Sequence, residues 1–210
     1  MATWIAHMRI AEYFMNGDVN LNNIDFLVGN IAPDCGVPNE DWSKFIPDKK
    51  ITHWQLSGRG GGSDAEDFKE KYAKKENAGF NFYLGYYFHL LTDNAWKEII
   101  LTPEYHEKIS KDRNFGWELK KDWYGQDHVY LQNNPDSIFF TMFSKIEEYP
   151  NKFLDFFPQD AFSKQIKHIT NFYLNAKEDT DREFPYLSKP EMDSFVNKTI
   201  TDIEKNYKTI

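Results

Sequence analysis

One segment of the sequence, residues 79–96, is apolar on nearly every side of the helix that its spacing predicts: G-F-N-F-Y-L-G-Y-Y-F-H-L-L-T-D-N-A-W. A helix without a polar face has to be buried all round, so the segment predicts a central helix over about 80–97 with other elements packed around it. Its run without charged residues ends at Asp93 and is shorter than the roughly 20 residues that a membrane helix needs. The sequence therefore predicts a core helix and no transmembrane segment.

Helical spacing also dominates the rest of the chain, where hardly any run alternates apolar and polar residues between turn dipeptides. Residues 37–63 are expected to be irregular, and their glycine run at 58–62 lacks the Lys-Ser/Thr of a phosphate-binding loop, which favours a flexible loop. We predict an all-α fold, a multi-helix bundle in a single domain over 1–210, because 210 residues suit one domain. The further helices are expected at about 3–15, 23–28, 64–75, 103–111, 115–131, 137–143, 158–176 and 189–207.

The composition limits the class of protein and of partner. Hydrophobic residues make up 40% and aromatic residues 17% of the chain, which excludes wholesale disorder. A net charge of −8 without a basic run argues against duplex nucleic acid as a partner. The single cysteine, Cys35, excludes a disulfide framework and a zinc site of paired thiolates, so a metal would have to sit on histidines and carboxylates. The first nine residues lack the basic and apolar regions of an export signal, and we expect a cytoplasmic protein.

Two polar residues stand within the central apolar segment. His89 and Asp93 are four residues apart, so their side chains project from one face of the predicted helix. An unpaired carboxylate inside a protein costs several kcal/mol, so Asp93 has to meet a cation, strong hydrogen-bond donors or water. The pair is therefore either part of a metal site or a hydrogen-bonded core pair.

Three residues elsewhere in the N-terminal half could complete a metal site. His7 lies on the inward stripe of the first predicted helix, His53 follows a loop rich in turn residues, and Asp34 ends the turn Ala-Pro-Asp. Each also has a simpler explanation: a core histidine, a solvated histidine, and an Asx turn or helix cap, respectively. It is less probable that all three simpler explanations hold together than that any one of them does. We therefore consider the three residues as a group.

A later ligand is expected between residues 122 and 127. Asp122 and Asp127 are five residues apart and lie about 140° from each other around a helix, so only one of them faces a shared site, and we favour Asp127. His128 would then point elsewhere, and His106 and His168 lie among Glu and Lys on amphipathic helices. These three histidines are left out of the predicted site.

The order of these residues resembles the zinc-dependent phospholipase C family, whose superfamily also contains zinc nucleases that cut single strands. The resemblance implies that Asp34, His53, His89 and Asp93 surround one zinc, that Asp93 bridges to a second zinc near His7, and that Asp34 also acts as the general base. The match covers most of the N-terminal half, and the motifs are Trp4-x-x-His7, Gly29-Asn30-x-Ala32-Pro33-Asp34, Thr52-His53 and Gly85-Tyr86-x-x-His89-x-x-x-Asp93-x-x-Trp96.

Two positions depart from the family pattern. In the extracellular phospholipases the tryptophan is the mature N-terminus and ligates zinc through its free amine, whereas three residues precede Trp4 here. Ile99 and Ile100 stand roughly where the family places a further histidine of its late zinc site. The resemblance therefore implies one or two ions in place of a three-zinc cluster.

The residue types alone lead to compatible chemistry. Three imidazoles with two or three carboxylates favour zinc, with iron or manganese as alternatives. Two divalent ions about 4 Å apart suit the hydrolysis of a phosphoester, because they clamp the phosphoryl group and activate water. We therefore predict a metal-dependent hydrolase of a phosphodiester or phosphomonoester, with a small phosphate ester or a phospholipid head group as substrate. A lipid would need an exposed apolar rim, for which residues 42–47 are the candidate.

Two other interpretations stay open. The same residues could hold a structural or sensory metal in a non-catalytic helical domain, since structural zinc sites have no open position for water. The chain could also be a metal-free bundle with buried pairs of histidine and carboxylate. Metal content, turnover and sensitivity to a chelator separate the three.

Overall fold

The computed structural model describes residues 1–21, 23–39, 44–56, 62–176 and 178–207, and its regular structure is almost entirely helical. The prediction of an all-α fold is confirmed. The α-helices are α1 (Trp4–Gly17), α2 (Ile24–Gly29), α3 (Lys49–Thr52), α4 (Ala65–Tyr72), α5 (Phe80–Ile99), α6 (Pro103–Lys111), α7 (Arg113–Asn133), α8 (Ile138–Thr141), α9 (Ala161–Asn175) and α10 (Lys189–Tyr207). Short 3-10 helices are η1 (Val19–Leu21), η2 (Ala32–Asp34) and η3 (Phe143–Lys145).

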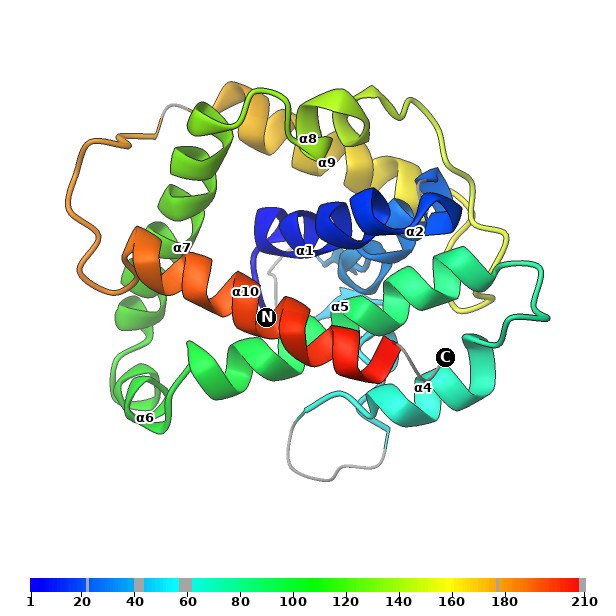
Figure 1. Cartoon of the computed structure of the whole chain (residues 1–210). Helices are drawn as coiled ribbons and strands as arrows, with labels where there is room; N and C mark the ends of the chain where they lie inside the picture. The colour runs from blue at the N-terminus through cyan, green and yellow to red at the C-terminus, as the bar shows by residue number, and fades with distance from the viewer. Residues whose placement is uncertain (22, 40–43, 57–61, 177, 208–210) are drawn as a thin grey trace.

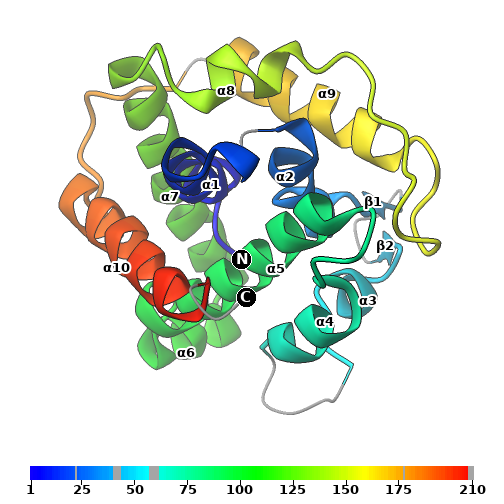
Figure 2. The same cartoon turned by 45° about the vertical axis from the view of Figure 1, so that its right-hand side comes forward.

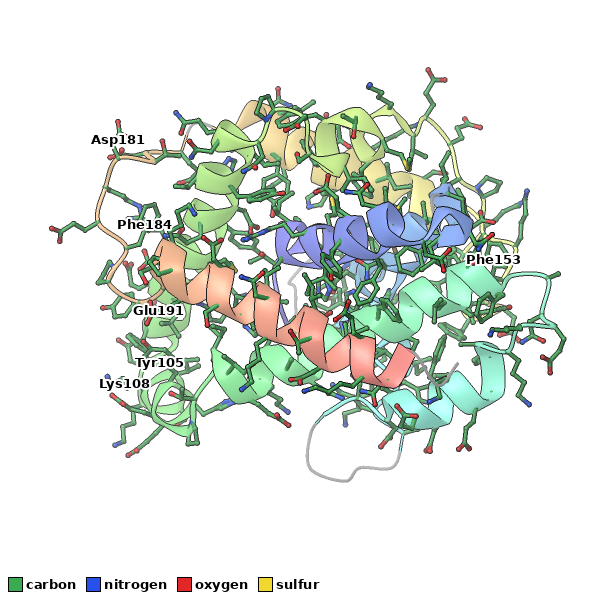
Figure 3. The ribbon with its side chains drawn as sticks, viewed as in Figure 1. Tyr105, Lys108, Phe153, Asp181, Phe184 and Glu191 are labelled. Atoms are coloured by element: carbon green, nitrogen blue, oxygen red, sulfur yellow. The ribbon has the colours of Figure 1, made fainter. Side chains whose placement is uncertain are left out.

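Helix α5 is the central helix that the apolar segment predicts. It contacts α1, α2, α4 and α10, and Figures 1 and 2 show it running through the middle of the molecule. Tyr86, Phe88 and Trp96 are fully buried on different sides of it. At its N-terminal end the ring of Phe82 stacks on that of Phe153, with the centroids 4.4 Å apart; Figure 3 labels Phe153. A single hydrophobic cluster includes residues from α1 to α10.

Helices α2 and α5 cross at unusually close range because each presents a glycine to the other. A Cβ atom on Gly85 would overlap the backbone carbonyl of Phe26, and one on Gly29 would overlap that of Phe82. Asn30, the residue after α2, lies against α5 and donates its side-chain N–H to the carbonyl of Gly85 at 3.4 Å. The crossing therefore fixes the backbone of Asn30 beside the helix that carries His89.

The variant Gly85→Ala tests this crossing. We expect it to lower the free energy of unfolding by about 3 kcal/mol or more, because the added methyl group meets rigid backbone and cannot be accommodated by a rotamer change. Urea denaturation measures the change. Gly17→Ala is the matched control: a Cβ there meets nothing within 4 Å, so its effect should stay within about 1 kcal/mol. Equal stability of the two variants would contradict a tight crossing.

Residues 37–63 contain more regular structure than the sequence predicts. Val37 and Pro38 (β1) pair antiparallel with Ile46 and Phe45 (β2), and α3 follows them directly. The strands are two residues long, too short to show an alternating pattern. Residues 42–43 of the proposed apolar rim and 58–61 of the glycine run lie outside the described residues.

Helix ends differ from the predicted ones by a few residues. The predicted ends of α6 and α10 agree with the structure, whereas α7 begins two residues early, because the Asp112 side chain accepts a hydrogen bond from the backbone of Asn114. The segment predicted as one helix at 137–143 is α8 followed by η3. Among the described residues, no helix combines the length and apolar character needed to cross a membrane.

Candidate metal centre

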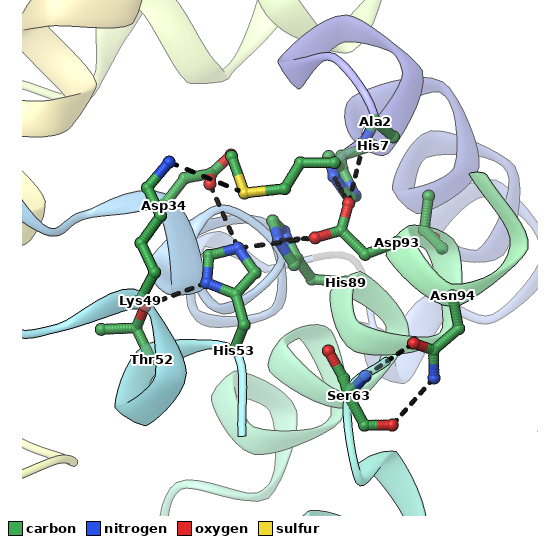
Figure 4. A network of polar contacts seen from close by, with 12 residues as sticks. Ala2, His7, Asp34, Lys49, Thr52, His53, Ser63, His89, Asp93 and Asn94 are labelled. Atoms are coloured by element: carbon green, nitrogen blue, oxygen red, sulfur yellow. Dashed lines mark hydrogen bonds and ion pairs between the residues drawn. The ribbon is translucent and has the colours of Figure 1, made fainter. Parts of the chain in front are cut away.

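Five of the predicted site residues converge at the centre of the molecule. His7 comes from α1, Asp34 from the end of η2, His53 from the residue after α3, and His89 and Asp93 from α5 (Figure 4). The side chains of all five residues are buried, that of Asp34 with 5% exposure. Side chains from distant parts of the sequence therefore surround one point, as the metal-site hypothesis requires.

The distances within this cluster are uniform. Asp93 lies 3.5 Å from His7 Nε2, 3.4 Å from His53 Nε2 and 3.5 Å from His89 Nε2, measured from its carboxylate oxygens. Asp34 lies 3.4 Å from His53 Nε2. Two groups of three could hold an ion with ligand atoms within 4.8 Å of one another: His7, His89 and Asp93, and Asp34, His53 and His89. The two groups share His89, so they form one continuous centre.

The Nε2 atoms of the three histidines have no hydrogen-bond partner although all three are buried. Leaving a buried polar atom unpaired costs about 1–3 kcal/mol, so three unpaired nitrogens aimed at one point require an explanation. The contacts to the carboxylates, at 3.4–3.5 Å, are too long for good hydrogen bonds. Atoms that each lie about 2.0–2.1 Å from one tetrahedral zinc ion are about 3.4 Å apart. The observed spacing therefore fits a metal ion.

Neighbouring groups hold two of the imidazoles by their other nitrogen. The Nδ1 of His89 lies 2.8 Å from the backbone carbonyl of Asn30, to which it donates, and this leaves the lone pair of its Nε2 free. The Nδ1 of His53 lies 3.0 Å from the hydroxyl of Thr52. Metal-ligating histidines commonly use the second nitrogen in this way, because the bond fixes the ring and its tautomer.

Two further groups orient the carboxylates. The indole N–H of Trp4 donates to Asp34 Oδ2 at 2.9 Å, and the backbone N–H of Ala2 donates to Asp93 Oδ1 at 2.8 Å. The hydroxyl of Tyr86 donates to the backbone carbonyl of Thr52, which ties α3 to α5. Each carboxylate therefore keeps a second oxygen directed toward the histidines.

Electrostatics keep both carboxylates ionised. Burial alone would raise the pKa of Asp34, but the close contact with His53 and the charge of His89 lower it to about 2. Burial likewise opposes the ionised form of Asp93, but the neighbouring His89 and His7 outweigh it and lower its pKa well below the usual value. Two fixed negative charges therefore lie inside the protein.

The imidazoles of His7 and His89 cannot both be protonated. Their rings stack with centroids 3.8 Å apart and planes within 2°. Burial and the charge of His89 lower the pKa of His7 to about 4. The charge of Asp93 overcomes the effect of burial and raises the pKa of His89. A divalent cation would satisfy both rings as neutral ligands, which protons cannot do at this distance.

The structure does not bring Asp127 to the cluster. Its Oδ1 accepts from the hydroxyl of Thr3 at 2.7 Å and its Oδ2 from that of Tyr173 at 2.5 Å, and burial raises its pKa to about 7. Thr3 caps α1, so Asp127 anchors the helix that carries Trp4 and His7. Asp122 pairs with Arg182 at 2.6 Å, away from the cluster.

The three histidines left out of the predicted site lie outside both candidate groups. His106 and His168 are exposed, and His128 is buried against Phe172 and Tyr173. The sequence does not predict that Trp4, Asn30 and Thr52 orient the site residues. All three nevertheless belong to the motifs that contain the candidate ligands. The bond from Ala2 is made by backbone, so no residue type could have signalled it.

Comparisons with known proteins give no match: neither a family model, nor a curated protein, nor a solved structure matches this chain. The likeness to the zinc-dependent phospholipase C family therefore rests on the order and spacing of the motifs. The function has to come from the geometry of the site.

Proposed function

We propose that this protein is a metal-dependent phosphoesterase that hydrolyses a phosphodiester or a phosphomonoester. The observation that supports this most is the convergence of three buried, unpaired Nε2 atoms with two ionised carboxylates. The donor set of imidazoles and carboxylates suits zinc, and iron or manganese would accept the same ligands. Divalent ions bound there would supply an activated water and shield the charge of a phosphoryl group.

Asp93 is central to the ligand set. It contacts His7, His53 and His89, and its Oδ1 and Oδ2 point toward different histidines. Asp93 belongs to the group of His7 and His89 and also contacts His53 of the other group, so it can link the two in a centre of one or two ions. Asp127 is not among the proposed ligands.

Asp34 is the proposed general base. Its low pKa keeps it ionised at neutral pH, and Trp4 holds one of its oxygens. The Asp34 side chain itself is buried, but Trp4, which holds it, is partly exposed, so this side of the centre lies nearest the solvent from which water and substrate would come. Asp34 therefore can orient the attacking water and accept its proton.

A phospholipid substrate has weaker support than a small phosphate ester. Of the proposed apolar rim, Ile46 is 66% exposed, but Pro47 is buried and Phe45 is partly buried. Within the described part of that rim, one exposed aliphatic side chain does not make a membrane-binding surface.

Metal analysis combined with turnover tests the proposed function. We expect purified protein to contain at least one divalent ion per chain and to hydrolyse p-nitrophenyl phosphate or bis(p-nitrophenyl) phosphate. A chelator should abolish turnover and zinc should restore it. Metal and thermal stability that fall together on chelation, without turnover of either ester, would instead establish a structural metal site. Unchanged stability and no bound metal would establish a metal-free bundle.

A further inference from the structure

Lys49 is the first residue of α3, and the candidate ligand His53 directly follows the helix. The backbone N–H of His53 donates to the carbonyl of Lys49 at 2.8 Å, so the two residues are one helical turn apart. The ammonium of Lys49 lies 3.9 Å from the sulfur of Met1, next to Ala2, which bonds to Asp93. Figure 4 shows the Lys49 side chain among those of Asp34 and His53. Lys49 therefore reaches the rim of the metal centre.

Helix α7 presents a second lysine from the other side. Lys120, Tyr124 and Asp127 lie on one face of α7 at steps of four and three residues. The ring of Tyr124 lies 6.2 Å from that of Trp4, whose indole donates to Asp34. The same face of α7 that anchors α1 through Asp127 thus passes Asp34 and carries Lys120.

Neither ammonium group is neutralised by a carboxylate within the described part of the chain. The Nζ of Lys49 lies 4.0 Å from the ring centroid of Phe45, and that of Lys120 lies 4.8 Å from that of Trp117. A ring face holds a cation in place but leaves its charge and its N–H groups available. By contrast, Lys108 lies 2.7 Å from the carboxylate of Glu104.

The charge of Lys49 acts on Lys120. Partial burial lowers the pKa of Lys120, and the charge of Lys49 lowers it further. The hydroxyl of Tyr124 completes the group: it has no hydrogen-bond partner among the described residues, and burial together with the charge of Asp34 raises its pKa, so it stays a neutral donor. Two ammonium groups without a carboxylate partner and a hydroxyl without a hydrogen-bond partner among the described residues, on the helices α3 and α7 beside the proposed phosphoesterase centre, are groups that would stabilise an anion.

We propose that Lys49, Lys120 and Tyr124 form an anion subsite that makes the enzyme prefer a phosphomonoester dianion to a phosphodiester monoanion. This inference rests on the proposed function and narrows its substrate class. A monoester offers a third non-bridging oxygen and a second negative charge, which the two ammonium groups and the hydroxyl can bind. A diester lacks both, so the subsite contributes little to its recognition.

Variants of the two lysines test the subsite, and variants of the neighbouring lysines serve as matched controls. Lys49→Gln and Lys120→Gln should each lower kcat/KM for p-nitrophenyl phosphate about tenfold at mildly alkaline pH, the value of one charge-assisted hydrogen bond. For bis(p-nitrophenyl) phosphate the loss should stay below about threefold. Lys50→Gln and Lys121→Gln are the controls: each removes the same charge from an exposed neighbour on the same helix. They should leave kcat/KM unchanged for both esters. Equal losses on both esters, or equal losses in the controls, would overturn the proposal.

A binding measurement separates this inference from the proposed function. Calorimetry with inorganic phosphate on the metal-loaded protein should give a dissociation constant about tenfold weaker in each subsite variant than in the wild type. Phosphate binding that depends on Lys49 and Lys120, without turnover of either ester, would reject the phosphoesterase but retain the subsite. If both lysine variants keep the wild-type turnover and the wild-type affinity for phosphate, the phosphoesterase is retained and the subsite is rejected.

Discussion

Replacing Asp93 by alanine is expected to remove bound metal and activity together. Asp93 contacts all three histidines of the cluster, so its loss takes a ligand from the group of His7, His89 and Asp93 and leaves His89 without its counter-charge. Loss of several kcal/mol of electrostatic stabilisation corresponds to at least about a 10³-fold fall in kcat. Elemental analysis and turnover of a chromogenic phosphoester, on the same preparation, measure the two effects.

Three further variants control this test for misfolding and non-specific effects. Asp93→Asn keeps an amide oxygen as acceptor for the Ala2 N–H, so it should fold while still losing metal. His53→Ala should behave like Asp93→Ala, whereas His106→Ala removes an exposed imidazole and should retain metal and activity. Full metal occupancy in Asp93→Asn or His53→Ala would refute the assignment of the ligands.

Asp34→Asn is expected to lose turnover to a greater extent than metal. The amide keeps the shape of the side chain and an oxygen that can accept the Trp4 N–H, but it is a very poor proton acceptor. Loss of a general base typically lowers the rate by about 10²–10⁴-fold. A metal content near that of the wild type, together with such a fall in kcat, would identify Asp34 as the base.

Either of two results would contradict this role of Asp34. Turnover close to that of the wild type would show that another group accepts the proton. Metal content that falls in parallel with kcat would make Asp34 chiefly a ligand. Far-UV circular dichroism of the variant is the control for folding, because Asp34 also joins η2 to α1 through Trp4.

The sequence predicts the central helix and the placement of His89 and Asp93 on one face of it, for a simple physical reason. A buried α5 follows from apolar residues on all sides, and the positions of His89 and Asp93 on one face follow from helical spacing. His7 follows from the stripe of α1 in the same way. These inferences need only the geometry of one helix.

Asp127 is a residue whose surroundings helical spacing does not predict. The spacing of α7 separates Asp122 from Asp127 but does not reveal what each faces, and in the structure Thr3 and Tyr173 occupy both oxygens of Asp127. Those partners lie 124 and 46 residues away in the sequence. Which of two acidic residues reaches a site depends on such tertiary contacts, which no local pattern records.

The glycine crossing of α2 and α5 also determines how freely this centre can be redesigned. The carbonyl that orients His89 belongs to Asn30, and Asn30 is held where it is by the contact of two backbones. To make the centre hold a larger ion, substitutions could be made on the Trp4 side, where the contact between Trp4 and Asp34 is made by side chains. On the His89 side, the first methyl group added at either glycine would separate the helices and move the ligand with them.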